Sequence, residues 1–273
     1  MSSTDALATR YLDVPGGRLG YDDTGHGTGT TVLLLPGMLV SRSIYRDLRP
    51  LLAAAGHRVV TMDLRGFGDA SIAWDDYSPA AIATDALALL DHLGIGRAVL
   101  VGHSYTGATV VRAAGLAPER VAGIALLSAF IEGPPANAFQ KALMKTVGAL
   151  WLRFPSTWGT YQRFAFPTKP AGFEEHRTGV VAALRTPGRK QATRGHLGGN
   201  AAPVGWSTAV TCPALAVMGS GDPDFPKPEL VADHQAAALN GRKVMIEGAG
   251  HYLMLERPQT TADALLAFLG ESA

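Results

Sequence analysis

Apolar residues along this chain form short continuous runs that alternate with longer segments of helical spacing. Residues 32–35 are all apolar, as expected for a central strand that helices cover on both sides. After Ser78-Pro79, a typical helix start, apolar residues recur at helical intervals from Ile82 to Leu93. The alternation of strands and helices predicts a mostly parallel sheet with right-handed crossovers. The further predicted strands are 57–63, 98–101, 121–127, 214–218 and 244–246, and the further predicted helices are 43–55, 106–116, 229–239 and 258–269.

Two segments depart from this alternation. Residues 12–21 alternate between apolar and polar around Pro15-Gly16-Gly17, which predicts an antiparallel hairpin at the start of the sheet. Residues 131–205 carry helical spacing and many aromatic side chains but no convincing strand. We therefore expect one α/β core made of residues 1–130 and 206–273, with residues 131–205 inserted between two core strands as a helical lid.

Composition narrows the class of protein. With 47% hydrophobic and 17% charged residues, the 273-residue chain is long enough to bury a large core. A net charge of +1 gives no general case for nucleic-acid binding. The sequence contains no zinc-ligand cluster, Walker loop or Rossmann fingerprint, so we expect no metal and no cofactor. The single cysteine, Cys212, cannot form an internal disulfide.

Signals of secretion or membrane insertion would lie in the N-terminal residues and in the apolar runs. The first eight residues lack the basic start and apolar core of a secretory signal. No uninterrupted apolar run approaches the ~20 residues of a membrane span. The expected location is the cytoplasm, without a membrane association.

The most informative stretch follows the predicted strand 98–101. There Gly102-His103-Ser104 connects the strand directly to the predicted helix 106–116, which places Ser104 on a tight turn. Such a turn requires small residues two positions before and after the serine. Gly102 meets this requirement, whereas Thr106 meets it only in part, because the expected glycine arrives one position late as Gly107.

A serine hydroxyl is a weak nucleophile at neutral pH, so it needs a base and a group that orients the base. Two loops after later strands supply candidates. Asp222 follows the predicted strand 214–218, and His251 follows the predicted strand 244–246. Because parallel strands present their carboxyl ends at one edge of the sheet, we expect Ser104, Asp222 and His251 to meet there.

The chain order Ser104, Asp222, His251 resembles that of the α/β-hydrolase family, and the resemblance extends over nearly the whole chain. It is supported by Gly37 after the early central strand and by Gly-x-Gly-His at 248–251. The segment Asp63-x-Arg65-Gly66-x-Gly68-x-x-Ser71 supports it further; we expect Asp63 and Arg65 to fix the loop that follows their strand. The resemblance implies an α/β-hydrolase fold, in which a mostly parallel sheet is flanked by helices and carries a helical lid.

The resemblance also implies roles for individual residues. Ser104 is the expected nucleophile, His251 the base and later the acid, and Asp222 the group that orients the imidazole. The backbone N–H groups of Met38 and Tyr105 are the expected oxyanion donors. The chain departs from the family before Met38, where Pro36-Gly37 stands in place of the usual His-Gly. Asp224 remains an alternative acid, and His103 is expected to pack beside the turn.

The insert supplies two further hypotheses about substrate. Its aromatic residues include Trp151, Trp158 and Phe164, which we expect to contribute to the substrate pocket. Residues 132–206 contain ten basic and three acidic residues, so this segment carries +7 and the rest of the chain −6. A solvated surface accounts for such an excess. The alternative is attraction of an anionic substrate or an acidic carrier protein.

The leading functional hypothesis is a serine hydrolase that cleaves an ester, lactone or thioester of a small to medium apolar molecule through an acyl-enzyme at Ser104. Epoxide hydrolases and haloalkane dehalogenases of this fold use an aspartate at that position, which disfavours their chemistry here. C–C bond hydrolases and cofactor-free haloperoxidase or perhydrolase enzymes share the triad and stay open, as does hydroxynitrile lyase chemistry. A ligand receptor without catalysis is the alternative of another class. Because Thr106 only replaces a glycine, we expect Thr106→Gly to remain active.

Overall fold

The computed structural model describes residues 7–131, 138–198 and 205–271, of which 138–145 are described by their backbone. Within these ranges the strands form one eight-stranded sheet in the order β1-β2-β4-β3-β5-β6-β7-β8. The pairs β1/β2 and β2/β4 are antiparallel, and all the other pairs are parallel. The predicted opening hairpin and the predicted parallel sheet are therefore confirmed. The strands are β1 (Arg10–Val14), β2 (Gly17–Asp23), β3 (Val32–Leu35), β4 (Val59–Met62), β5 (Ala98–His103), β6 (Val121–Leu127), β7 (Ala214–Gly219) and β8 (Arg242–Ile246).

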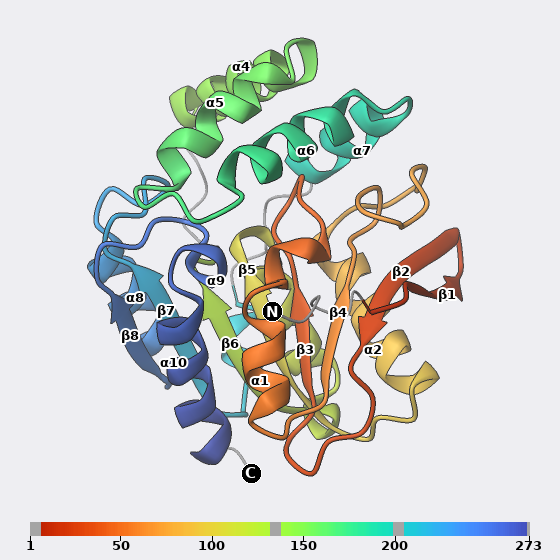
Figure 1. Ribbon diagram of the computed structural model, residues 1–273, viewed down its shortest axis with the longest axis vertical. Coiled ribbons are helices and arrows are strands. Elements are labelled where there is room, and N and C mark those ends of the chain that lie inside the picture. The colour runs from red at the N-terminus through yellow and green to blue at the C-terminus, as the bar shows by residue number, and fades with distance from the viewer. Residues whose placement is uncertain (1–6, 132–137, 199–204, 272–273) are drawn as a thin grey trace.

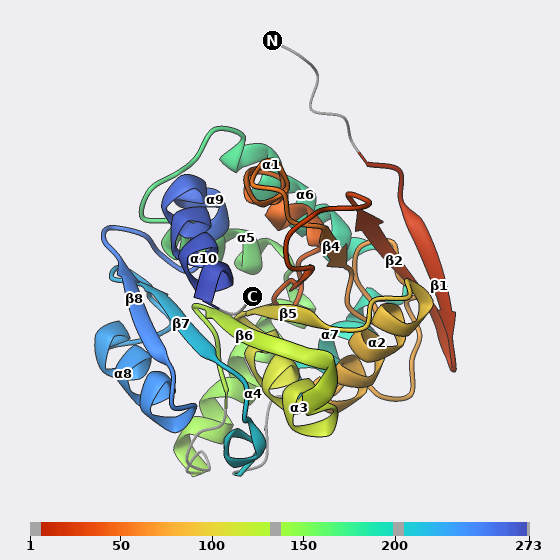
Figure 2. The same cartoon turned by 90° about the horizontal axis from the view of Figure 1, so that it is seen from below.

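Helices cover both faces of the sheet. Figure 2 shows α1, α9 and α10 on one face and α2, α3 and α8 on the other. The α-helices of the described residues are α1 (Arg49–Ala54), α2 (Pro79–His92), α3 (Gly107–Leu116), α4 (Ala138–Arg153), α5 (Ser156–Ala165), α6 (Phe173–Arg185), α7 (Arg189–Gly198), α8 (Pro228–Ala238), α9 (Leu253–Glu256) and α10 (Pro258–Glu271). Ser78 caps α2 through its hydroxyl, which accepts from the Ala81 N–H at 3.2 Å, as the sequence indicates.

The predicted helix 43–55 is wrong as one element. The chain instead forms a 3-10 turn, η1 (Arg42–Tyr45), followed by the separate helix α1. Pro50 stands in the first turn of α1, where a missing N–H is tolerated, but it cannot lie inside a longer helix. The Ser43 hydroxyl bonds the Ser41 hydroxyl at 2.8 Å and does not cap a helix.

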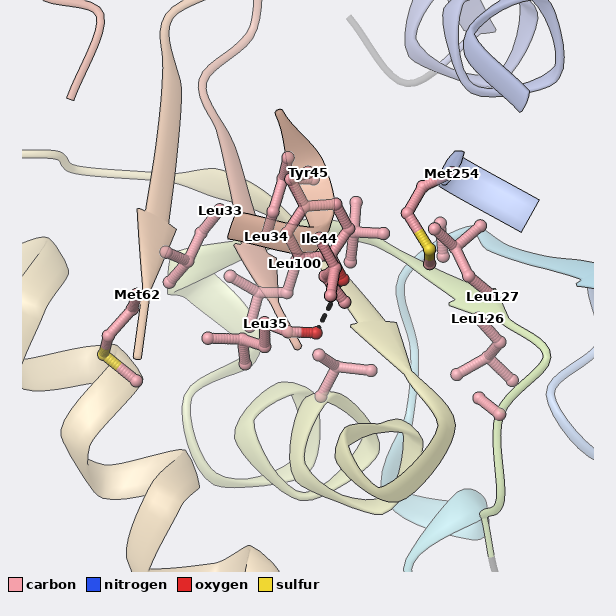
Figure 3. Close-up of a cluster of buried hydrophobic side chains, with 14 of the residues drawn as sticks. Leu33, Leu34, Leu35, Ile44, Tyr45, Met62, Leu100, Leu126, Leu127 and Met254 are labelled. Atoms are coloured by element: carbon pink, nitrogen blue, oxygen red, sulfur yellow. Dashed lines mark hydrogen bonds between the residues drawn. The ribbon is translucent and has the colours of Figure 1, made fainter. Parts of the chain in front are cut away.

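The core centres on β3 and β5, whose side chains are buried on both faces. Leu33, Leu34 and Leu35 have no exposed surface, and Figure 3 shows them packed among side chains from β4, β6, η1 and α9. The Tyr45 hydroxyl donates to the carbonyl of Leu35 at 2.7 Å (Figure 3). This bond ties η1 to the end of β3, so the segment between them is held at the carboxyl edge of the sheet.

A buried ionic cluster fixes the neighbouring loop. Asp63, which follows β4 and has no exposed surface, pairs with the Arg42 guanidinium and accepts from the N–H groups of Arg42 and Asp69 at 2.8 and 2.9 Å. The Arg65 guanidinium donates to both carboxylate oxygens of Asp85 at 2.6 and 2.8 Å. Asp63 and Arg65 therefore hold the loop as the sequence predicts. Arg42 also lies only a few residues after Met38, so the cluster helps to fix that segment.

Helices α4 to α7 follow β6 and precede β7, and they lie across one end of the sheet (Figure 1). No strand occurs among the described residues 138–198. The Arg189 guanidinium in α7 donates to the carbonyls of Gly66 and Gly68 at 2.6 and 2.8 Å, which anchors these helices to the loop after β4. The predicted ends of the insert, 131 and 205, adjoin segments 132–137 and 199–204, which lie outside the described residues. Among the described residues, no helix combines the length and apolar character needed to cross a membrane.

Candidate active site

Ser104 lies on the turn between β5 and α3. Its φ is +53°, a left-handed conformation that costs a non-glycine residue roughly 1–2 kcal/mol. The Ser104 carbonyl accepts from the N–H of Phe130 at 2.9 Å, which holds the turn against the end of β6. A Cβ on Gly102 would overlap the carbonyl oxygen of Thr106. Gly102 is therefore required because backbone meets backbone across this turn.

The structure explains why Thr106 and Gly107 depart from the usual pattern. The Thr106 hydroxyl is fully buried and lies 2.9 to 3.1 Å from the carbonyls of Leu35, Pro36 and His103, and its single proton is shared among these three acceptors. A Cβ on Gly107 would lie 2.5 Å from the carbonyl oxygen of Phe130. The close approach thus falls at position 107, while the side chain at 106 ties the turn to the end of β3.

Asp222 and His251 meet at the carboxyl ends of β7 and β8. His251 Nδ1 lies 2.9 Å from Asp222 Oδ2, and both side chains are buried. The other Asp222 oxygen, Oδ1, accepts from the Asp224 N–H at 2.9 Å. Burial acts to raise the pKa of Asp222, but the charge of His251 and the hydrogen bonds from His251 and from the Asp224 N–H together outweigh it, so that pKa lies below its ordinary value. Asp222 is therefore a fixed carboxylate on the Nδ1 side of the imidazole.

Asp224 lies on the opposite side of the same ring. Its Oδ2 is 3.5 Å from His251 Nε2 and accepts from the Tyr161 hydroxyl at 2.8 Å. Burial acts to lower the pKa of His251, but the charges of Asp222 and Asp224 outweigh burial and raise that pKa to about 9. The two acidic candidates thus have different positions, with Asp222 at Nδ1 and Asp224 near Nε2.

The loop that carries His251 is held by the inserted helices. The His251 N–H donates to the carbonyl of Ala165, at the end of α5, at 2.9 Å. The Glu256 carboxylate accepts from the N–H groups of Gly250 and Thr168, both at 2.9 Å. Burial raises the pKa of Glu256 to about 7 despite these bonds. The position of the imidazole therefore depends on contacts from residues 165–168 as well as on β8.

His103 packs beside the turn, as predicted. Its Nε2 lies 3.0 Å from the carbonyl of His251, and the two rings are 4.9 Å apart. Burial lowers the pKa of His103 to about 3, so the ring is neutral and donates to that carbonyl. His103 thereby fixes the backbone at His251.

Met38 and Tyr105, the expected oxyanion donors, both lie in segments that adjoin Ser104. Tyr105 follows the serine directly, and its N–H belongs to the first turn of a helix, where donors lack intrahelical partners. Gly37 approaches the serine closely, because a Cβ on it would lie 2.8 Å from His103 Nδ1 and 3.1 Å from Ser104 Cβ. The backbone that leads into Met38 is therefore packed against the Ser104 turn.

Aromatic residues of the inserted helices gather beside Asp224. The Trp158 ring stacks on Tyr161 at 4.7 Å, and Trp151 meets Trp158 edge-on at 4.6 Å. Trp158 is 3% exposed. Phe164 corrects the expectation drawn from the sequence: its side chain is 68% exposed, so its ring is directed to solvent and is not placed to line a pocket.

A cavity of about 480 Å³ lies between α6 and the segment after β3. Its wall includes Leu39 and Val40, which follow Met38 in the chain. Both apolar and charged side chains contribute to its wall. The lining residues are Leu39, Val40, Ser41, Ser43, Arg46, Phe67, Gly68, Gly172, Glu175, His176, Gly179, Val180, Ala183 and Arg189.

Asp222, Asp224 and His251 also form a group, within the described residues, whose ligand atoms all lie within 4.8 Å of one another and could in principle hold a metal ion. His251 Nδ1 and Asp222 Oδ2 already satisfy each other at 2.9 Å. Two of the three possible ligand atoms are therefore already engaged in the hydrogen bond that orients the imidazole.

A serine on a strand-to-helix turn, with an Asp–His pair after two later strands of a parallel sheet, defines a hydrolase-type site. The model of the alpha/beta hydrolase fold family matches residues 30–258. The chain therefore belongs to the alpha/beta hydrolase fold family.

Individual relatives carry different names. Epoxide hydrolase A of Mycobacterium tuberculosis is 28% identical over 97% of this chain and 98% of its own. A 2-hydroxy-6-oxononadienedioate/2-hydroxy-6-oxononatrienedioate hydrolase of Paraburkholderia phymatum is 36% identical over 49% of each chain. The structure of a thermophilic esterase from Thermogutta terrifontis superposes with a TM-score of 0.82 at 25% identity, covering 97% of this chain and 99% of that one.

The sequence placed Ser104, Asp222 and His251 at strand ends, and the structure shows Asp222 bonded to His251. It did not indicate that Asp224 faces Nε2 or that Tyr161 bonds it. The aromatic content of the insert was a signal for a lining role, but Tyr161 bonds Asp224 across 63 residues of chain. No local pattern specifies such a contact.

Proposed function

We propose that this protein is a serine hydrolase that forms an acyl-enzyme at Ser104 with an ester, lactone or thioester. The observation that carries the proposal is the left-handed Ser104 turn combined with the 2.9 Å bond between His251 and Asp222. Because Nδ1 is occupied by Asp222, Nε2 is the nitrogen that is left to take the serine proton.

In this proposal Ser104 Oγ bonds the acyl carbon while its proton passes to His251 Nε2. The carbonyl oxygen becomes an oxyanion, and the N–H groups of Met38 and Tyr105 stabilise it by about 3 kcal/mol each. The intermediate then expels the leaving group, which takes the proton from Nε2. Water then adds to the acyl carbon while His251 Nε2 takes its proton; the Ser104 Oγ–acyl bond breaks, Oγ regains the proton from Nε2, and the acid product leaves.

The epoxide hydrolase relative does not favour epoxide opening here. In such enzymes an aspartate carboxylate attacks the epoxide carbon, and this chain has a serine at that position. A C–C bond hydrolase is the second candidate function. The Paraburkholderia phymatum relative favours it, because it is 36% identical over half of this chain and enzymes of that kind share the triad.

The proposal is tested with a fluorophosphonate probe and a p-nitrophenyl acyl ester. We expect the probe to label Ser104, and we expect Ser104→Ala to lower kcat about 10⁴-fold or more. Ser156→Ala, at an exposed position at the start of α5, is the matched control and should behave as the wild type. Ester turnover that survives in Ser104→Ala contradicts the proposal. A folded wild-type protein that neither reacts with the probe nor hydrolyses esters supports the ligand receptor instead.

A further inference from the structure

Asp224 holds a position that the Ser104, Asp222 and His251 mechanism leaves unexplained. The backbone of Asp224 supports the triad, because its N–H donates to Asp222 Oδ1 at 2.9 Å. Its side chain turns the other way and brings Oδ2 to 3.5 Å from His251 Nε2. The Asp222 side chain has no exposed surface, whereas that of Asp224 is 23% exposed. Asp224 is therefore the carboxylate of this pair that a bound molecule can reach.

The location of Asp224 identifies the part of the substrate that it meets. In the proposed function, Nε2 serves two oxygens in turn: it accepts the Ser104 proton and then donates it to the leaving group. A carboxylate oxygen 3.5 Å from Nε2 consequently lies close to where the leaving oxygen and its next few atoms pass. Asp224 therefore faces the alcohol side of an ester.

Tyr161 and its neighbours give this position a defined chemistry. The Tyr161 hydroxyl donates to Asp224 Oδ2 at 2.8 Å, which fixes the carboxylate and leaves its other oxygen, Oδ1, as an acceptor. Trp158 stacks on Tyr161, and the Phe225 ring lies 6.5 Å from that of His251. Aromatic faces combined with a carboxylate attract ammonium groups and accept hydrogen bonds from hydroxyls, and they repel anions.

The positive charge of the inserted helices does not cancel this local preference. Arg177 pairs with Glu174 at 2.7 Å, and the Arg189 guanidinium donates to two backbone carbonyls. These two guanidinium groups are therefore already engaged with partners away from His251 Nε2. Among the described residues, the charged group paired with His251 Nε2 is the carboxylate of Asp224, at 3.5 Å.

We propose that Asp224, oriented by Tyr161, selects the leaving group. It favours esters whose alcohol carries an ammonium or hydroxyl group two or three bonds from the ester oxygen, and it disfavours those that carry a carboxylate there. This inference rests on the proposed serine hydrolase function and names the substrate class for it.

The experiment compares four acetate esters that share one acyl group: ethyl acetate, 2-hydroxyethyl acetate, acetylcholine and O-acetylglycolate. For the wild type, we expect kcat/KM to be highest for acetylcholine, to fall through the hydroxyethyl and ethyl esters, and to be lowest for O-acetylglycolate. We expect the ratio of the two charged substrates to reach about a hundredfold. Ratios within one variant cancel any change in the strength of the base, so they report selection alone.

Asp224→Asn should reduce the ratio of acetylcholine to O-acetylglycolate at least about tenfold. Tyr161→Phe, which keeps the ring and removes the donor, should reduce the ratio by less. Asp233→Asn is the matched control, because Asp233 pairs with Lys243 on the surface of α8, and it should keep the wild-type ratio. If Asp224→Asn does not fold, Tyr161→Phe alone decides the matter.

The inference is overturned by a wild type that labels with fluorophosphonate and hydrolyses all four esters without this order, or by an Asp224→Asn variant that keeps the wild-type ratio. A wild type that labels at Ser104 but prefers O-acetylglycolate also overturns it and favours an anionic substrate. Absence of both labelling and ester hydrolysis identifies failure of the proposed function itself. The two failures are therefore distinguishable.

Discussion

The nucleophile turn and the imidazole side of the site are built in different ways. At the turn, Gly102, Ser104 and Gly107 are fixed by backbone contacts with no room for a Cβ at either glycine. At the imidazole, His251 takes its position from Asp222, from Ala165 at the end of α5, and from Glu256. Steric exclusion therefore dominates one half of the site, and hydrogen bonds and charges from distant segments dominate the other. Substitutions in these two parts of the site should therefore have different effects on stability and activity.

The largest effect is expected at the turn. In Gly102→Ala, the new Cβ overlaps the Thr106 carbonyl, and because both groups belong to the backbone, neither can move aside cheaply. We expect the free energy of unfolding to fall by about 2–3 kcal/mol and kcat/KM to fall about a hundredfold or more. Denaturant unfolding and ester hydrolysis measure the two quantities. Gly96→Ala is the control, since a Cβ there has nothing within 4 Å. Wild-type behaviour of Gly102→Ala would show that the turn has room for a Cβ at position 102.

The next effect is electrostatic and belongs to the imidazole side. The ring faces the carboxylates Asp222 and Asp224, with Glu256 farther away and neutral His103 beside it. Only neutral His251 can accept the serine proton, and its pKa is raised to about 9. As pH rises from 6 to 9, the neutral fraction grows, so kcat/KM should increase about tenfold per pH unit and level off above 9.

Asp224→Asn sharpens this prediction. Removal of one of the two nearby negative charges lowers the pKa of His251, so the rise in kcat/KM should shift to lower pH. A pH–rate profile of both proteins on an uncharged ester measures the shift. An identical profile in wild type and Asp224→Asn would mean that Asp224 does not act on the imidazole.

A smaller effect is expected at Thr106. The Thr106 hydroxyl donates its single proton among three nearby carbonyls, so Thr106→Val, which keeps the shape, should cost about 1–3 kcal/mol of unfolding free energy. The matched control is Thr109→Val, because the buried Thr109 hydroxyl has no hydrogen-bond partner in the described part of the chain, and the change there should be neutral or stabilising. Equal unfolding free energies for the two variants would contradict this role.

The same bonds revise the expectation for Thr106→Gly. The glycine removes the donor and adds backbone freedom, so we now expect a less stable protein whose remaining folded fraction is active. Thermal unfolding combined with probe labelling of Ser104 separates loss of fold from loss of activity.

The smallest effect is expected on the outer surface of the inserted helices. Phe164 is mostly exposed, so Phe164→Ala should change the unfolding free energy by less than about 0.5 kcal/mol and kcat/KM by less than about twofold. Trp158→Ala, at a buried ring of the cluster beside Asp224, is the contrast and should cost about 3 kcal/mol or more. A large loss of activity in Phe164→Ala would instead indicate that Phe164 contributes to the substrate pocket.

Much of the fold follows from local pattern. Continuous apolar runs such as residues 32–35 and 98–101 specify strands buried on both faces, and Ser78-Pro79 specifies the start of α2. The same rules failed at residues 43–55, where Pro50 divides the predicted helix, although the proline was visible in the sequence. The sequence also did not show which aromatic residues of the insert face the core and which face solvent, as the exposure of Phe164 illustrates.

By itself, the sequence determined that Ser104, Asp222 and His251 stand in loops directly after strands, because a parallel sheet brings the carboxyl ends of its strands to one edge. It also determined the glycine of the turn, because only that residue fits where two backbone segments touch. The tertiary structure alone decided which carboxylate faces which imidazole nitrogen and that Tyr161 bonds Asp224. Those contacts depend on how α5 packs over the sheet, and packing between segments far apart in the chain leaves no periodic trace in the sequence.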